Sequence, residues 1–301
     1  MDETDFEILK IIDANCRISI SQIAHKLNFS LRNISQRLDR LIQENVIKRF
    51  SVQFNYKLLG FRNYIGTIDS QDKLLPDSFY DRLQKIPEIH RIWHLLKGNA
   101  KIAFFVKNEN HLNNFILKIS DLGYKLTNIN EINGFNSDSQ ASYSLTDWRI
   151  ISYLINNSRA TKKQISITLG ISEKTVKRRL NRMLEKNLIQ FIPEINFDAI
   201  SGMVTALLSL KTNGNTDFIH HKIKNDNTIK YWRTEDEMNT SVAYFLYGNN
   251  LNEIYEMYNE VIKRDYIDNA NLHFIVRNWE TSMMIEQAIS EKINKSYGLI
   301  N

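Results

Sequence analysis

The sequence predicts an α+β fold in which one two-part unit occurs twice. Three observations predict it: the chain repeats itself at a spacing of 142 residues, helix-capping residues recur at equivalent places in both copies, and alternating strand and helix segments follow the helices of each copy. The predicted arrangement is a tandem duplication of a winged helix-turn-helix followed by a ferredoxin-like βαββαβ domain. In chain order, the predicted domains span residues 1–52 (winged helix-turn-helix 1), 53–142 (ferredoxin-like domain 1), 143–195 (winged helix-turn-helix 2) and 196–301 (ferredoxin-like domain 2 with a C-terminal helix).

The repeat is clearest in the helical part of each copy. Residues 5–50 align with residues 147–192 without a gap. The identical pairs at this spacing include Asp5/Asp147, Asn15/Asn157, Arg17/Arg159, Gln22/Gln164, Ser30/Ser172, Arg37/Arg179, Arg40/Arg182 and Gly60/Gly202. A period of this length is far too long for a solenoid repeat, so the pattern indicates duplication of a whole unit.

Each copy opens with three predicted helices. In the first copy, the capping residues Ser19 and Ser30 begin the second and third helices, and the third helix runs to Asn45. A short helix, a tight turn and a longer helix form the helix-turn-helix layout. The β-rich stretches that follow, residues 46–52 and 188–192, are the predicted wings.

The second part of each copy has the order β-α-β-β-α-β. The segments are residues 64–69, 77–85, 89–95, 101–106, 110–122 and 126–134 in the first copy, and 204–211, 217–224, 229–233, 241–247, 251–263 and 271–279 in the second. Such a sheet packs its two helices on one face and leaves the other face for a partner sheet. Trp93 and Trp232 are predicted to pack the two sheets together, and residues 282–295 to form an amphipathic helix.

Positive charge is concentrated in the second helical module. The chain has 39 basic and 34 acidic side chains, a net charge of +5. Residues 1–50 hold 8 basic and 7 acidic side chains, whereas residues 145–192 hold 10 and 3. A basic patch on a helix-turn-helix is typical of binding to the phosphates of nucleic acid. Charges interrupt every apolar stretch and Cys16 is the only cysteine, so we expect a cytoplasmic protein without a membrane contact, disulfide, metal or cofactor.

The third helix of each copy is the predicted recognition helix. Its apolar residues share one face, which leaves polar residues on the opposite face for the major groove of double-stranded DNA. The predicted base contacts, near the N-terminal ends of these helices, are Arg32, Asn33, Gln36, Lys174, Thr175 and Arg178. The predicted phosphate contacts are Arg40, Lys48, Arg49, Lys162, Lys163 and Arg182.

The repeated motifs resemble those of the Lrp/AsnC transcription regulators. They read Asp5-Phe6-Glu7-Ile8-Leu9, Asn15-Cys16-Arg17-Ile18-Ser19 and Arg37-Leu38-Asp39-Arg40-Leu41 in the first copy, and Asp147-Trp148-Arg149-Ile150-Ile151, Asn157-Ser158-Arg159-Ala160-Thr161 and Arg179-Leu180-Asn181-Arg182-Met183 in the second. The resemblance implies a transcription regulator whose ferredoxin-like domain serves dimerisation and effector binding. Because one chain holds two units, we expect a pseudo-dimer within the chain that also forms homo-oligomers. Its DNA site would be asymmetric, with half-sites about one helical turn (roughly 10 bp) apart.

The resemblance also implies a small amino-acid effector near the glycine-containing hairpin between the second and third strands. Gly98 and Asn99 match that turn in the first copy. In the second copy, residues 235–238 replace the turn without a glycine. The two copies therefore differ at the place where the resemblance puts an effector.

Two other functions are compatible with the sequence. Siroheme decarboxylases resemble Lrp/AsnC proteins in architecture, and His90 and His94 are the residues that would handle a tetrapyrrole; strand periodicity predicts that both lie on one face. The second copy has Trp232-Arg233 and no histidine there, and the recognition helices remain basic, so we predict that the protein is not an enzyme. The third function is that of a partner-binding adaptor without operator recognition.

Overall fold

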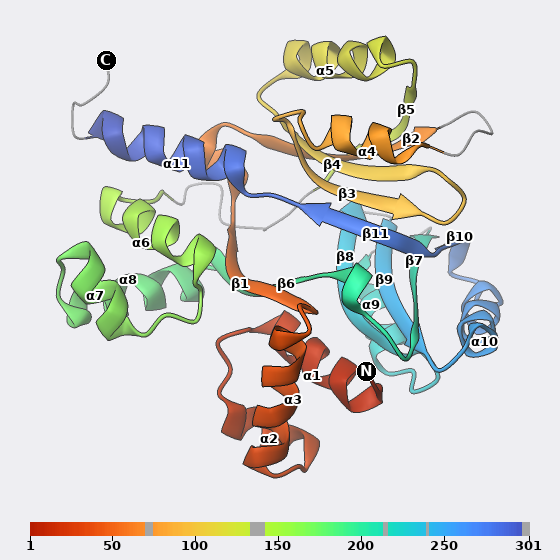
Figure 1. The fold of residues 1–301 in the computed structure, drawn as a ribbon, viewed down its shortest axis with the longest axis horizontal. Helices are drawn as coiled ribbons and strands as arrows, with labels where there is room; N and C mark the ends of the chain where they lie inside the picture. The colour runs from red at the N-terminus through yellow and green to blue at the C-terminus, as the bar shows by residue number, and fades with distance from the viewer. Residues whose placement is uncertain (70–74, 133–141, 213–215, 239–240, 297–301) are drawn as a thin grey trace.

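The computed structural model describes residues 1–69, 75–132, 142–212, 216–238 and 241–296. It has the predicted α+β fold, with two helical modules and two antiparallel sheets (Figure 1). The first copy contains α1 (Glu3–Ala14), α2 (Ile20–Leu27), α3 (Leu31–Gln43), β1 (Ile47–Phe54), β2 (Arg62–Asp69), α4 (Asp77–Leu83), β3 (Ile89–Leu95), β4 (Ala100–Val106), α5 (Glu109–Asp121) and β5 (Lys125–Glu131). We call α1–α3 module 1.

The second copy repeats this order. It contains α6 (Leu145–Asn156), α7 (Lys162–Leu169), α8 (Glu173–Glu185), β6 (Ile189–Ile195), β7 (Val204–Thr212), α9 (Thr216–Lys224), β8 (Tyr231–Met238), β9 (Ser241–Gly248), α10 (Leu251–Ile262), β10 (Ile267–His273), β11 (Ile275–Glu280) and α11 (Met283–Ser296). We call α6–α8 module 2. Among the described residues, none of the helices is long and apolar enough to cross a membrane.

The capping residues explain where the helices of module 1 begin. Ser19 caps α2 and Ser30 caps α3, each by accepting a hydrogen bond from a backbone N–H three residues later. Asn28, with φ of 57°, ends α2 in the left-handed conformation that a short turn requires. The first helix begins at Glu3, because Asp2 caps it and forms a capping box with Asp5.

The predicted wings form one shared element. β1 and β6 pair antiparallel with each other, from Ile47 opposite Ile195 to Phe54 opposite Ile189. We call this two-stranded element the ribbon. Each copy supplies only one strand, so each strand finds its backbone hydrogen bonds on the other copy. The ribbon therefore joins the two modules at the centre of the molecule (Figure 1).

The two larger sheets are linked by a strand that changes sheet. Sheet 1 has the order β11-β3-β4-β2-β5 and sheet 2 the order β10-β7-β9-β8. The last strand, predicted as continuous over residues 271–279, is in fact divided at Phe274. β10 stays in sheet 2, whereas β11 crosses to the edge of sheet 1 and pairs with β3. The chain then continues into α11, which packs against α6. The second ferredoxin-like domain is thus tied to the first by main-chain hydrogen bonds.

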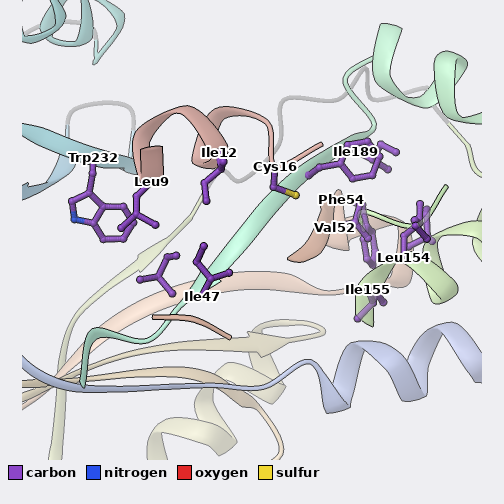
Figure 2. Packing of buried hydrophobic residues seen from close by; sticks show 14 of the residues in the cluster. Leu9, Ile12, Cys16, Ile47, Val52, Phe54, Leu154, Ile155, Ile189 and Trp232 are labelled. Carbon is purple, nitrogen blue, oxygen red and sulfur yellow. The ribbon is translucent and has the colours of Figure 1, made fainter. Parts of the chain in front are cut away.

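One large core joins the two modules, the ribbon and the inner face of sheet 2. Figure 2 shows residues of module 1, the ribbon and module 2 packed in sequence, with Trp232 of β8 at one end. Trp232 is buried against Phe197 and Phe245, with ring centroids 5.7 and 5.5 Å away. Trp93 lies in a separate small cluster with Ile275 of β11. The two tryptophans therefore pack in different clusters, and Trp93 contacts a residue of the second copy.

Candidate functional site

The recognition helix of module 1 presents three predicted base contacts. Ile34, Leu38 and Leu41 of α3 are buried, which directs Arg32 and Gln36 outward. Both of these side chains are exposed, and within the described residues neither makes a hydrogen bond or ion pair. The third predicted contact is Asn33, which is partly buried; its Oδ1 accepts a hydrogen bond from Arg37 Nε at 3.1 Å.

Module 2 presents a more basic surface on the same scaffold. Lys174 and Arg178 of α8 are exposed and make no hydrogen bond or ion pair within the described part of the chain. Thr175 is partly buried, and its hydroxyl lies 3.0 Å from Ser172 Oγ at the helix N-cap. On α7, Lys162 and Lys163 are also exposed. Four predicted DNA contacts of this module are therefore accessible to DNA phosphates: Lys162, Lys163, Lys174 and Arg178.

Arg40 and Arg182, predicted to contact phosphate, also have a structural role that the prediction did not include. Arg40 Nη2 donates to Oδ2 of the fully buried Asp5 at 2.6 Å, and Arg37 Nη1 donates to Oδ1 at 2.8 Å. In module 2, Arg182 Nη2 donates to Asp147 at 2.8 Å. These contacts tie the first helix of each module to the third. The signal was present in the repeat, because the aspartate and both arginines are identical in the two copies.

Arg49 also makes contacts within the protein. Its Nε donates to Glu194, its Nη1 to Asn156 Oδ1 at 2.7 Å and its Nη2 to Ser282 Oγ at 2.9 Å. These partners hold the guanidinium of a partly buried side chain (28% exposed), and its contact with phosphate stays a prediction. Its neighbour Lys48, at an irregularity in the register of β1, is exposed.

The two modules contact each other through their equivalent turns. Arg17 donates to the carbonyl oxygens of Ser158 and Ala160, both at 2.8 Å, and Arg159 donates to the carbonyl oxygen of Ile18 at 3.2 Å. The ribbon holds both turns, since Phe191 O accepts from Cys16 N and Phe50 O from Ser158 N. These reciprocal contacts fix the position of one recognition helix relative to the other. Arg17 and Arg159 thus form a contact between the two modules, a role that the repeated motifs did not indicate.

A β-bulge in each sheet directs two successive side chains into the interior. In β3 the register shifts between Ile89 and Arg91, and in β8 it shifts between Tyr231 and Arg233. The extra residue in β3 is His90, which stacks on Phe105 at a centroid distance of 4.1 Å. The equivalent residue in β8 is Trp232. The bulges occur at the same place in both copies.

The bulge also corrects the prediction that His90 and His94 share a face. His94 stacks on Tyr80 of α4, which lies on the helix-covered face of sheet 1. His90 lies on the opposite face, where Nε2 is 2.9 Å from Asn63 Oδ1. Period-two alternation fails here because the bulge places His90 on the same face as Arg91, which shifts the alternation by one residue before His94 is reached.

Behind the ribbon lies a pocket of about 280 Å³, which we call the interior pocket. Its polar walls include three arginines, one from the ribbon, one from sheet 1 and one from sheet 2: Arg49, Arg91 and Arg233. Each is paired with a carboxylate. Besides Arg49–Glu194, Arg91 Nη2 lies 2.6 Å from Glu280 Oε1, and Arg233 Nε donates to Asp13 Oδ1 at 2.7 Å. The predicted effector residues Gly98 and Asn99 lie at the β3–β4 turn, away from this lining.

Burial sets the protonation of the pocket's titratable groups. It lowers the pKa of His90 to about 3, with a further contribution from the positive charge of Arg91, so this imidazole is neutral near pH 7. Burial, followed by the nearby Glu280, raises the pKa of Glu194. For Glu280, burial opposes ionisation, but the charge and hydrogen bond of Arg91 outweigh it and lower its pKa. The pocket is therefore lined by fixed guanidinium groups and by three carboxylates, of which Glu194 and Glu280 differ in acidity.

Comparison with known proteins identifies both helical modules. The family described as "Winged helix-turn-helix DNA-binding" matches residues 1–48 and 144–190. The chain is similar to the HTH-type transcriptional regulator LysM of Saccharolobus solfataricus, with 28% identity over 110 residues, which is 36% of this chain and 75% of LysM. It is also similar to the HTH-type transcriptional regulator Ptr1 of Methanocaldococcus jannaschii, with 27% identity over 134 residues, which is 43% of this chain and 86% of Ptr1.

A solved structure matches both units at once. It is that of the siroheme decarboxylase NirDL, which is 13% identical, has a TM-score of 0.51 and is matched over 98% of this chain and 100% of its own. This comparison contradicts our prediction that the protein is not an enzyme, because an enzyme has the same two-unit architecture. At this level of identity the likeness shows the fold alone. The chain thus holds two segments that match the winged helix-turn-helix DNA-binding family, and it is similar in sequence to HTH-type transcriptional regulators.

Proposed function

We propose that the protein regulates transcription by binding double-stranded DNA sequence-specifically, with two non-identical recognition helices in one chain. The observation that carries this proposal is the pair of exposed, polar helix faces at the N-terminal ends of α3 and α8. Arg32 lies on one, and Lys174 and Arg178 lie on the other. Arginine in this position of a major-groove helix can donate two hydrogen bonds to guanine.

The fixed contact between the modules supports simultaneous binding. The Arg17 and Arg159 contacts and the ribbon hold α3 and α8 in one arrangement before DNA is bound. Preorganisation lowers the entropy cost of placing two helices in two stretches of groove. The helices would read half-sites about one turn (roughly 10 bp) apart.

The proposal predicts that the DNA site is asymmetric. Arg32, Asn33 and Gln36 of module 1 have as counterparts Lys174, Thr175 and Arg178 of module 2, so the two modules differ at each of these positions. Different side chains read different bases, so the two halves of the site would differ in sequence. Module 2 would supply most of the phosphate attraction, from Lys162, Lys163 and α8.

A titration of the protein against genomic DNA fragments at two salt concentrations tests this proposal. We expect tight binding to a few fragments, which weakens steeply as salt rises. The control variant Lys224→Ala should bind DNA as the wild type does, because Lys224 is an exposed lysine on α9, outside both modules. Equal affinity for all fragments, or binding that is insensitive to salt, would contradict sequence-specific regulation.

A siroheme decarboxylase-like activity is the second candidate, and one observation favours it. His90, Arg91 and Arg233 come together in one pocket between the two units, and the neighbour with the same two-unit architecture is a siroheme decarboxylase. Against it, the volume of about 280 Å³ lies at the lower end of the range for small-molecule pockets, so a tetrapyrrole would require the pocket to open. A spectral titration with siroheme tests this function. A shift of the main absorption band in the wild type that His90→Gln removes would favour it, and an unchanged spectrum would dismiss it.

A further inference from the structure

The interior pocket lies where both DNA-binding modules and both sheets meet. The ribbon forms one wall, and the inner face of sheet 1 forms another. Asp13 of α1 and Ile155 of α6 contribute one side chain from each module, and Arg233 contributes one from sheet 2. No recognition-face residue lines it. The pocket is thus separate from the DNA-binding surface, but contacts the elements that position it.

The walls of the pocket combine a cationic side with an apolar side. Ile65, Ala103, Phe105 and Ile285 supply the apolar side. The cationic side consists of the three arginines, each held by a carboxylate from a different element, so the guanidinium planes are fixed before any ligand enters. A fixed guanidinium suits a planar carboxylate, which it can bind through two parallel hydrogen bonds.

We propose that the interior pocket binds a small carboxylate anion with a compact apolar part, held by Arg91 and Arg233 above the apolar side. Both arginines lie on the equivalent bulges of the two units, and both act on Glu280: Arg91 by a hydrogen bond and Arg233 through its charge. Both guanidiniums line the same pocket of about 280 Å³, so both can contact one small anion. The ligand would be recognised by its carboxylate and its hydrocarbon, and an ammonium group would not be needed.

At full ionisation the charges of the pocket lining balance, and protonation of Glu194 would leave the positive excess that favours an anion. Three guanidiniums face three carboxylates, and the neutral His90 adds no charge. Glu194 takes up a proton more readily than an ordinary glutamate because it is buried next to Glu280. When it does so, the pocket has one positive charge in excess, which an entering carboxylate neutralises.

Three probes of matched size test the proposal by thermal unfolding of the full chain. They are 3-phenylpropionate, phenylalanine and phenethylamine, which carry a carboxylate, both charges and an ammonium, respectively. We expect 3-phenylpropionate to raise the midpoint temperature increasingly with concentration, at least as much as phenylalanine does, and phenethylamine to leave it unchanged. A shift with phenethylamine as large as that with 3-phenylpropionate, or no shift with either acid at 10 mM, would overturn the proposal.

Variants of the pocket residues test where 3-phenylpropionate binds. Arg91→Gln and Arg233→Gln should each remove the shift, whereas Arg277→Gln, which changes an exposed arginine of β11 outside the pocket, should keep it. Ala103→Leu fills the apolar side without altering a charge and should also remove it, which keeps the test valid if an arginine variant fails to fold. A shift that survives in Arg91→Gln and Ala103→Leu would place the ligand elsewhere and overturn the proposal.

Occupancy of the pocket should also change DNA affinity, and this consequence rests on the proposed function. The ribbon residues Arg49 and Glu194 line the pocket, so a ligand that contacts them acts on the element that joins the modules. We expect 3-phenylpropionate to change the affinity for a selected DNA fragment by about fivefold or more, and no change would refute the coupling. The thermal shift is measured without DNA, so failure of ligand binding and failure of DNA binding are distinguishable.

Discussion

Modules 1 and 2 hold their first and third helices together in the same way but expose different side chains to solvent. Asp5 and Asp147 are both fully buried, and each accepts from the arginine at the second position of an Arg-x-x-Arg pair. At the opposite face, Arg32 in one module stands where Lys174 stands in the other. The buried aspartates and their arginines keep their identity in both copies, because a buried charge needs its partner. Exposed residues are free to diverge, and here the divergence falls on the surface that would read DNA.

The largest expected effect tests the shared scaffold. Asp5→Asn should lower the free energy of unfolding by about 2–3 kcal/mol, because it removes charge-assisted hydrogen bonds to two arginines at 2.6 and 2.8 Å. Asp147→Asn should cost less, because only one of its two arginine contacts is as short as 2.8 Å and the other is 3.5 Å. Urea unfolding followed by circular dichroism measures both. The exposed Asp39 of α3 supplies the control Asp39→Asn, and a loss of equal size in all three variants would break the comparison.

The next effect tests the divergent surface. Arg178→Ala and Arg32→Ala should each reduce discrimination between specific and random DNA by about 1–3 kcal/mol, if each arginine binds a base edge through two hydrogen bonds. The two variants should relax different halves of the site. Binding measurements on a selected fragment and on mixed-sequence DNA check this. Equal losses on both kinds of DNA would reassign these arginines to phosphate contacts.

The two bulge positions should differ in their response to pH. The pKa of His90 falls from 6.5 to about 3 on folding, so as pH falls below 6.5 the unfolded chain takes up the proton first and stability is lost. At about 1.4 kcal/mol per pH unit, this contribution falls by about 2 kcal/mol between pH 6.5 and pH 5. Trp232 at the equivalent place does not titrate.

His90→Gln should therefore flatten the dependence of the unfolding free energy on pH in this range. The control is His25→Gln, since His25 is an exposed histidine of α2. If His25→Gln and His90→Gln had the same effect on the pH profile, the burial of His90 would not be its cause.

The smallest expected effect lies in the contact between the modules. Arg17→Ala removes two hydrogen bonds at 2.8 Å and should cost about 1–2 kcal/mol, whereas Arg159→Ala removes one at 3.2 Å and should cost less than about 1 kcal/mol. Both should lower the affinity for a two-half-site DNA more than the affinity for a single half-site. An unchanged ratio of these affinities would show that the contact does not set the spacing of the modules.

The sequence predicted the order of elements well and the contacts between copies poorly. The repeat and the caps at Ser19 and Ser30 depend on residues close together in the chain, and the structure confirms both caps. The pairing of β1 with β6 and the crossing of β11 depend on partners more than 100 residues away, and the bulge at His90 depends on the register of β3 against β4. Periodicity within one strand carries no information about such partners. For the same reason the sequence did not reveal that Arg49 pairs with Glu194, which lies 145 residues away.

Footprinting the protein on its selected DNA fragment tests the central claim most directly. Two non-identical recognition helices in one chain predict two protected half-sites of different sequence about one turn apart, both covered by a single chain. The double variant Lys174→Ala/Arg178→Ala should lose protection of one half-site and keep the other. A palindromic footprint whose two halves weaken equally in that variant would contradict the account.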